Sequence, residues 1–248
     1  VFAGPFESAM AHSAVAPEAG EAACIETLCA LVDKSLLRVE PGEPARWRLY
    51  EPMRLHARAE LRAAGGEAAA RQRHGLAMAA HATALHMIRS DSPDEAVLDR
   101  FGASYADFEQ AFVLACERQD AEVAAQTLDA LRRLDQLRGE LSATERRLTA
   151  VLPLLAQAQG RARALMLSTR ASSGWVKLPE WPPALAAEQA VLAWRTLGDS
   201  DIELHHNLML LGTERARLGD CAGAQQAIDE ASAFLRAAAG TLSSQRFA

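Results

Sequence analysis

The chain has 248 residues, with 26 lysines and arginines against 32 aspartates and glutamates, and its formal net charge is −6. This acidic balance argues against a nucleic-acid-binding surface over the whole chain. No run of about 18 apolar residues occurs, so we expect no membrane span. Ala, Leu, Arg and Glu, all good helix formers, dominate and predict a mainly helical protein.

The start of the chain predicts a cytoplasmic segment rather than a secreted protein. It lacks the charged stretch and apolar run of a signal peptide. Because it begins at Val1 and not at Met, we interpret it as part of a longer cytoplasmic protein.

A hairpin between two helices is the clearest local pattern. Apolar and charged residues alternate over 36–40 and again over 46–50, which is typical of half-buried strands. Residues 41–44 contain two prolines and a glycine and make the turn. A helical pattern precedes the hairpin, and another begins at Glu51 with Pro52 in its first turn. Helix, two-stranded wing and helix together predict a winged helix.

The helix before the wing does not suit DNA contact. Its sequence, EAACIETLCALVDKSLL, has acidic residues, one lysine and no arginine before the wing. A helix that enters the major groove needs exposed basic or amide side chains. We therefore expect a winged helix of a type that does not bind DNA.

Catalytic and metal-binding patterns are not visible. The sequence has no GxxxxGK[ST] phosphate loop, no GxSxG and no HExxH. His74 and His81 are two helical turns apart, too far to share a metal. The cysteines lack CxxC spacing and are predicted to be reduced packing thiols, with Cys116 and Cys221 on apolar faces. We expect no catalytic residue, no metal and no cofactor in this chain, and no enzymatic activity of its own.

Short turns recur about every twenty residues in the second half of the chain. They stand at residues 119–120, 138–140, 159–160, 198–199 and 218–220. Helices joined by such short turns must be antiparallel neighbours. Small residues at Gly212, Ala224 and Ala231 match a tetratricopeptide repeat. The expected organisation is a winged-helix domain at 1–65, connecting helices at 66–103 and an α-solenoid of TPR-like helix pairs at 104–248.

Three stretches of the first 75 residues carry a family resemblance: VFAGPF, LVDKSLLRVE and RWRLYEPMRLHARAELRAAGG. They resemble the segment that follows the nucleotide-binding domain in bacterial STAND-class ATPases, which are related to NB-ARC switch proteins. Many of these are transcriptional regulators with helical repeats. In the wider class a Met-His-Asp motif touches the nucleotide. That motif falls on Leu49-Tyr50-Glu51 here, so the resemblance implies nucleotide sensing by Tyr50 and Glu51, with Tyr in place of His.

Two functions follow as hypotheses. In the first, the chain is the switch-and-sensor part of an ATP-dependent transcriptional regulator. Its winged helix packs on an upstream nucleotide-binding domain of the same protein, and its repeats receive a protein or small-molecule inducer. In the second, it is a free-standing TPR-like scaffold for protein–protein interaction. A phosphate loop encoded upstream of Val1 would favour the first, and a start codon there the second.

The partner surface is expected on the first helix of each repeat, over 125–137, 161–174 and 202–217. The candidate partner-binding residues are Arg132, Asp135, Arg163, Arg170, His206, Glu214 and Arg215. Their arginines suggest an acidic partner or an anionic ligand, or reflect the general abundance of arginine. Trp175 and Trp181 flank a proline-rich insertion, where either core packing or partner binding would place them.

Overall fold

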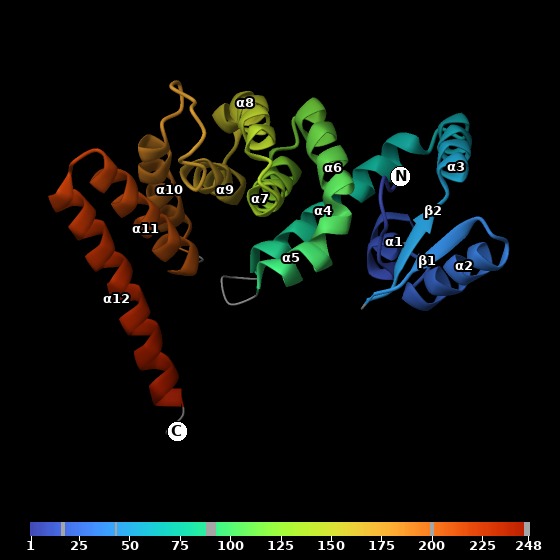
Figure 1. Cartoon of the computed structure of the whole chain (residues 1–248), viewed down its shortest axis with the longest axis horizontal. Coiled ribbons are helices and arrows are strands. Elements are labelled where there is room, and N and C mark those ends of the chain that lie inside the picture. The colour runs from blue at the N-terminus through green and yellow to red at the C-terminus, as the bar shows by residue number, and fades with distance from the viewer. Residues whose placement is uncertain (16–17, 43, 88–92, 199–200, 246–248) are drawn as a thin grey trace. The chain divides into compact units, whose positions relative to one another are not determined.

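The structure is a computed structural model that describes residues 1–15, 18–42, 44–87, 93–198 and 201–245. Within these residues the chain is mainly helical with one small antiparallel sheet (Figure 1), which confirms the predicted class. The chain separates into two compact units, residues 1–140 and 141–248. The expected boundary between connecting helices and repeats, at residue 103, falls inside the first unit.

The first unit contains a two-stranded hairpin, which we call the wing, and seven α-helices in its described part. The helices are α1 (Ser8–Val15), α2 (Glu21–Asp33), α3 (Glu51–Ala63), α4 (Glu67–Met87), α5 (Asp94–Phe101), α6 (Tyr105–Arg118) and α7 (Ala121–Arg138), with a short 3₁₀ turn η1 (Gly102–Ser104) before α6. The strands are β1 (Leu37–Glu40) and β2 (Arg46–Leu49). Both strands agree with the predicted wing to within one residue.

The wing is a two-stranded hairpin with one apolar and one charged face. Its register pairs Leu37 with Leu49 and Val39 with Trp47. The backbone of Phe6 extends the sheet by one bridge: its N–H donates to the Trp47 carbonyl (2.9 Å), and its own carbonyl accepts from the Trp47 N–H (2.8 Å). Leu37 and Trp47 are buried. The alternation in the sequence therefore reports the two faces of the sheet correctly.

The helical part of the first unit holds its core. α4 packs against α1, α6 and α7. Met78, Phe101, Phe108 and Leu128 are fully buried there. Asp120 caps α7, since its Oδ1 accepts the Val123 N–H at 3.1 Å and satisfies a free donor of the first turn.

The second unit is built from consecutive helices that pack side by side. These are α8 (Leu141–Gln157), α9 (Gly160–Ala171), α10 (Pro183–Leu197), α11 (Asp201–Arg217) and α12 (Cys221–Gln245). α9 packs on α10, α10 on α11, and α11 on α12. At Gly212 a Cβ atom would lie 2.9 Å from Ile228 Cγ1. The absence of a side chain there lets α11 and α12 approach closely, as the small-residue pattern predicted.

Left-handed backbone marks the predicted turns. Positive φ angles occur at Gln119 (58°), Gly139 (73°), Gly198 (64°) and Gly219 (84°). Such angles end helices because they redirect the chain while its last carbonyls are still bonded. The turn predicted at 198–199 is confirmed up to Gly198; residue 199 lies outside the described residues.

All four cysteines are free. Cys24 is buried and Cys116 is half-buried, and burial raises the pKa of the Cys116 thiol to about 11. Cys29 and Cys221 are exposed. The expected apolar position of Cys221 is wrong, because this residue opens α12 at its solvated end.

Candidate functional site

A polar pocket of about 170 Å³ lies where the wing meets α3. It is lined by Phe2, Ala3, Gly4, Phe6, Arg38, Arg48, Leu49, Tyr50, Glu51 and Arg54. The two residues that the family resemblance singles out, Tyr50 and Glu51, are both present. We call this cavity the arginine-lined pocket.

Strand register places two of its arginines together. Arg38 on β1 stands directly opposite Arg48 on β2, an arrangement that like charges disfavour. Glu40 bridges them, with its Oε1 at 2.7 Å from Arg38 and 3.4 Å from Arg48. One carboxylate therefore serves two guanidinium groups on the charged face of the wing.

The third arginine comes from the first turn of α3. Tyr50 stands at the N-cap with extended backbone and no side-chain cap, and it is 44% exposed. Glu51 accepts two hydrogen bonds from Arg54, at 2.6 and 2.8 Å. The hydrogen bond from Arg54 lowers the pKa of the Glu51 carboxyl, so this carboxylate stays ionised at neutral pH.

Arginine is the most frequent residue in the lining of the pocket. Its lining offers guanidinium forks, a phenol and a carboxylate, but neither a histidine nor a thiol. Arginine forks suit planar or tetrahedral anions, and here each is partly occupied by Glu40 or Glu51. The sequence reasoning missed the three arginines. The wing register, which brings Arg38 opposite Arg48, was the signal that could have found two of them.

A second, apolar cavity of about 420 Å³ opens between α1, α2, the wing and α3. Each helix presents to it side chains one turn apart: Ala11 and Val15 from α1, Cys24 and Leu28 from α2, Met53 and Ala57 from α3. We call this cavity the apolar groove.

Two of the helices around the groove, α2 and α3, have few buried residues. Only Cys24 and Leu28 are buried on α2, and no residue of α3 is buried. Leu31, Leu36 and Met53 line the groove while still partly exposed. Voids larger than a water molecule are few in a packed protein interior, and this cavity is larger than that.

On α7 the two predicted partner-binding residues differ in exposure. Arg132 is half-buried, and its guanidinium donates to Gln136 (3.1 Å) and Asp129 (3.4 Å). Asp135 is fully buried and accepts the Tyr105 hydroxyl at 2.6 Å. The expected outward position of Asp135 is wrong, because the carboxylate turns into the first unit to meet that hydroxyl.

The expectation for α9 is also wrong at one position. Arg170 is fully buried, and its guanidinium donates to the carbonyls of Trp181 (2.6 Å), Ser173 (2.9 Å) and Val176 (3.3 Å). It thereby holds the loop between α9 and α10. Arg163 is half-buried and donates to the Leu155 carbonyl.

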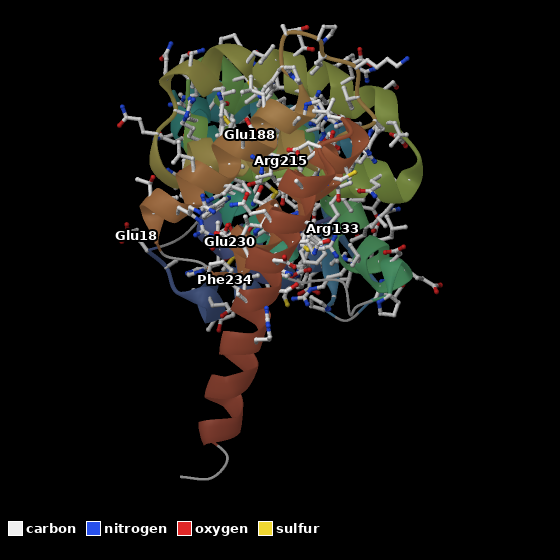
Figure 2. The ribbon with its side chains drawn as sticks, turned by 90° about the vertical axis from the view of Figure 1, so that its left-hand side faces the viewer. Glu18, Arg133, Glu188, Arg215, Glu230 and Phe234 are labelled. Carbon is white, nitrogen blue, oxygen red and sulfur yellow. The ribbon has the colours of Figure 1, made fainter. Side chains whose placement is uncertain are left out.

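The α11 candidates are one buried carboxylate and two half-buried side chains. Glu214 is 7% exposed and pairs with Arg217 at 2.6 Å, so its expected exposure is wrong. His206 Nε2 lies 3.4 Å from Ser172 Oγ. Arg215 lies beside Glu188 at 3.3 Å (Figure 2).

The two tryptophans of the insertion differ in exposure. Trp181 is 3% exposed and belongs to the core, whereas Trp175 is 38% exposed. Core packing therefore accounts for Trp181 alone.

In the part of the chain that the structure describes, no helix is long and apolar enough to cross a membrane. No three His, Cys, Asp or Glu side chains among those residues gather in a way that could hold a metal ion. No protein-family model, curated protein or solved structure matches this chain.

Proposed function

We propose that the chain is the switch-and-sensor part of a cytoplasmic, ATP-dependent transcriptional regulator of the STAND class. Its wing and flanking helices pack on a nucleotide-binding domain that precedes them in the same protein. Its helical pairs, TPR-like in their small-residue seams, receive a protein or small-molecule inducer. DNA contact belongs to another part of the regulator.

The apolar groove is the observation that carries this proposal. A surface of this kind marks a place for a partner, because soluble proteins rarely leave large contiguous apolar patches open. The helix stripes around it converge on one space, so another helix or a loop of the preceding domain would complete the core. The acidic composition of α2 also fits protein packing better than phosphate contact.

The nucleotide belongs to the preceding domain in this proposal. The chain has no phosphate loop, so by itself it neither hydrolyses ATP nor binds ATP or ADP at micromolar concentration. The arginine-lined pocket, with Tyr50 and Glu51, is the surface of this chain that would face the nucleotide. A calorimetric titration of the isolated chain with ADP, giving a micromolar Kd, would contradict this division of labour.

The exposures of the candidate partner-binding residues reduce the number that could contact the inducer. Arg170, Asp135 and Glu214 are used inside the units. Arg132, Arg163, His206 and Arg215 are partly exposed and remain the proposed contact residues.

The test uses two tryptophan substitutions on the same helix. Thr27 lines the groove, whereas Ala30 is exposed elsewhere on α2. Association of the chain with the separately expressed preceding domain is measured by sedimentation velocity for T27W and A30W. We expect T27W to weaken association at least tenfold and A30W to leave it unchanged. Equal effects, or a reading frame that starts at Val1, would favour the free-standing scaffold instead.

A further inference from the structure

The first turn of α6 carries a buried carboxylate that holds the start of the chain. Asp107 is 1% exposed. Its Oδ1 accepts the Ala3 N–H at 2.7 Å, and its Oδ2 accepts the Gly4 N–H at 2.9 Å. His74 Nε2 lies 2.9 Å from the same Oδ1. Because an unpaired buried carboxylate is costly, these contacts fix where the segment 2–4 lies.

The same turn is held from the other side by α7. The Tyr105 hydroxyl donates to Asp135, which is fully buried. The guanidinium of Arg138 lies 4.3 Å above the Tyr105 ring and donates to the Gly102 carbonyl at 2.8 Å. Residues 102–107 therefore lie between two sets of polar contacts, one with α7 and one with the start of the chain.

The backbone of this turn is closely packed on both sides. A Cβ atom on Gly4 would lie 2.9 Å from the Ala103 carbonyl oxygen. On the other side, a Cβ atom on Gly102 would lie 3.3 Å from Arg138 Nη2. Dense packing transmits strain, so a displacement at Gly4 bears directly on the Ala103 backbone. The α7 side is joined to the same turn by the Tyr105–Asp135 and Arg138–Gly102 hydrogen bonds.

The segment held by Asp107 is also a wall of the candidate site. Phe2, Ala3 and Gly4 line the arginine-lined pocket together with Arg48 and Glu51. We propose that residues 102–107 couple α7 to the arginine-lined pocket, with Asp107 as the positioning residue that holds the pocket wall. We call this segment the coupling turn.

The coupling gives the proposed regulator a route from its sensor helices to its nucleotide-facing surface, and this biological role rests on the proposed function. The physical coupling between α7 and the pocket wall does not depend on that function. Coupling between two sites is reciprocal, so loosening the contacts with α7 must loosen the pocket wall, and crowding the wall must disturb α7.

The first experiment measures amide hydrogen exchange by NMR in the whole 248-residue chain, without nucleotide or partner. Tyr105→Phe removes the hydroxyl that donates to Asp135, and Tyr105 is not among the residues that line the pocket. Thr127→Val is the control, because it removes a fully buried hydroxyl on α7 itself, one that donates to the Val123 carbonyl. We expect Y105F to speed exchange of the Ala3 and Gly4 amides at least fivefold, and T127V to leave them unchanged.

The reciprocal experiment starts at the pocket. Gly4→Ala pushes on the Ala103 carbonyl, and we expect faster exchange of the Glu140 amide, which donates to the Asp135 carbonyl, with α10 amides unchanged. Unchanged Ala3 and Gly4 amides in Y105F would overturn the coupling, as would equal acceleration in T127V. Because no partner is present, such a failure is distinct from failure of the groove association.

Discussion

Acidification should destabilise the first unit through His81. This side chain packs 4.8 Å from the Phe101 ring and 5.5 Å from the Phe108 ring. Burial, with smaller effects from Arg100 and Arg46, lowers the pKa of His81 from 6.5 to about 4. The folded state thus resists a proton that the unfolded chain accepts.

The sign and size of the effect follow from linkage. Below pH 6.5 the unfolded state binds more protons than the folded state, so stability is complete above this pH and falls until about pH 4. One pKa unit corresponds to about 1.4 kcal/mol, so the His81 contribution lost over this range is about 3 kcal/mol. His81 is half-buried, so solvent screening lowers the effect below this value.

The assay is urea unfolding at pH values between 7 and 4. Unfolding is monitored by the NMR methyl signal of Met78, which is fully buried on α4. The wild-type chain is compared with H81Q, which cannot titrate there, and with H56Q at an exposed histidine. We expect the free energy of unfolding of the wild type to fall by up to about 3 kcal/mol more than that of H81Q over this range. A constant difference between these two proteins from pH 7 to pH 4 would refute the reasoning.

Three further predictions concern packing and reactivity. Arg170→Ala should lower the free energy of unfolding of the second unit by about 3 kcal/mol or more, since it leaves buried carbonyls unpaired. Arg170→Lys should not recover this stability in thermal unfolding, because an ammonium lacks the guanidinium fork. Gly212→Ala should cost about 1–3 kcal/mol by overpacking, and an Ile228→Ala background that fails to relieve this cost would show that the contact is not limiting. Iodoacetamide at pH 8 should modify Cys29 at least tenfold faster than Cys116, whose pKa is about 11; comparable rates by mass spectrometry would disprove the burial of Cys116.

The wing and the turns could be predicted because short-range sequence signals specify them. Alternation over 46–49 reports the two faces of a strand, and a glycine such as Gly139 is chosen where the backbone must be left-handed. These signals are contained within a few residues. They need no knowledge of what packs above them.

Burial of polar side chains could not be predicted in the same way. Arg170 and Asp135 stand on helices at positions where a polar residue ordinarily faces water. Their burial depends on distant partners, a loop that folds back over α9 and the hydroxyl of Tyr105. The coupling turn likewise depends on contacts between residues about 100 positions apart, such as Gly4 and Asp107, which no local pattern contains.

The central claim is that the apolar groove is covered by the preceding domain, and thiol labelling tests it most directly. T27C places a thiol in the groove, and A30C places one elsewhere on α2. Labelling is measured by mass spectrometry in the 248-residue chain and in the proposed longer protein, in which a nucleotide-binding domain precedes this chain. The two thiols should react at similar rates in the chain alone, whereas T27C should react at least tenfold more slowly than A30C in the longer protein. Equal rates in the longer protein would show that the groove remains open and would contradict the account.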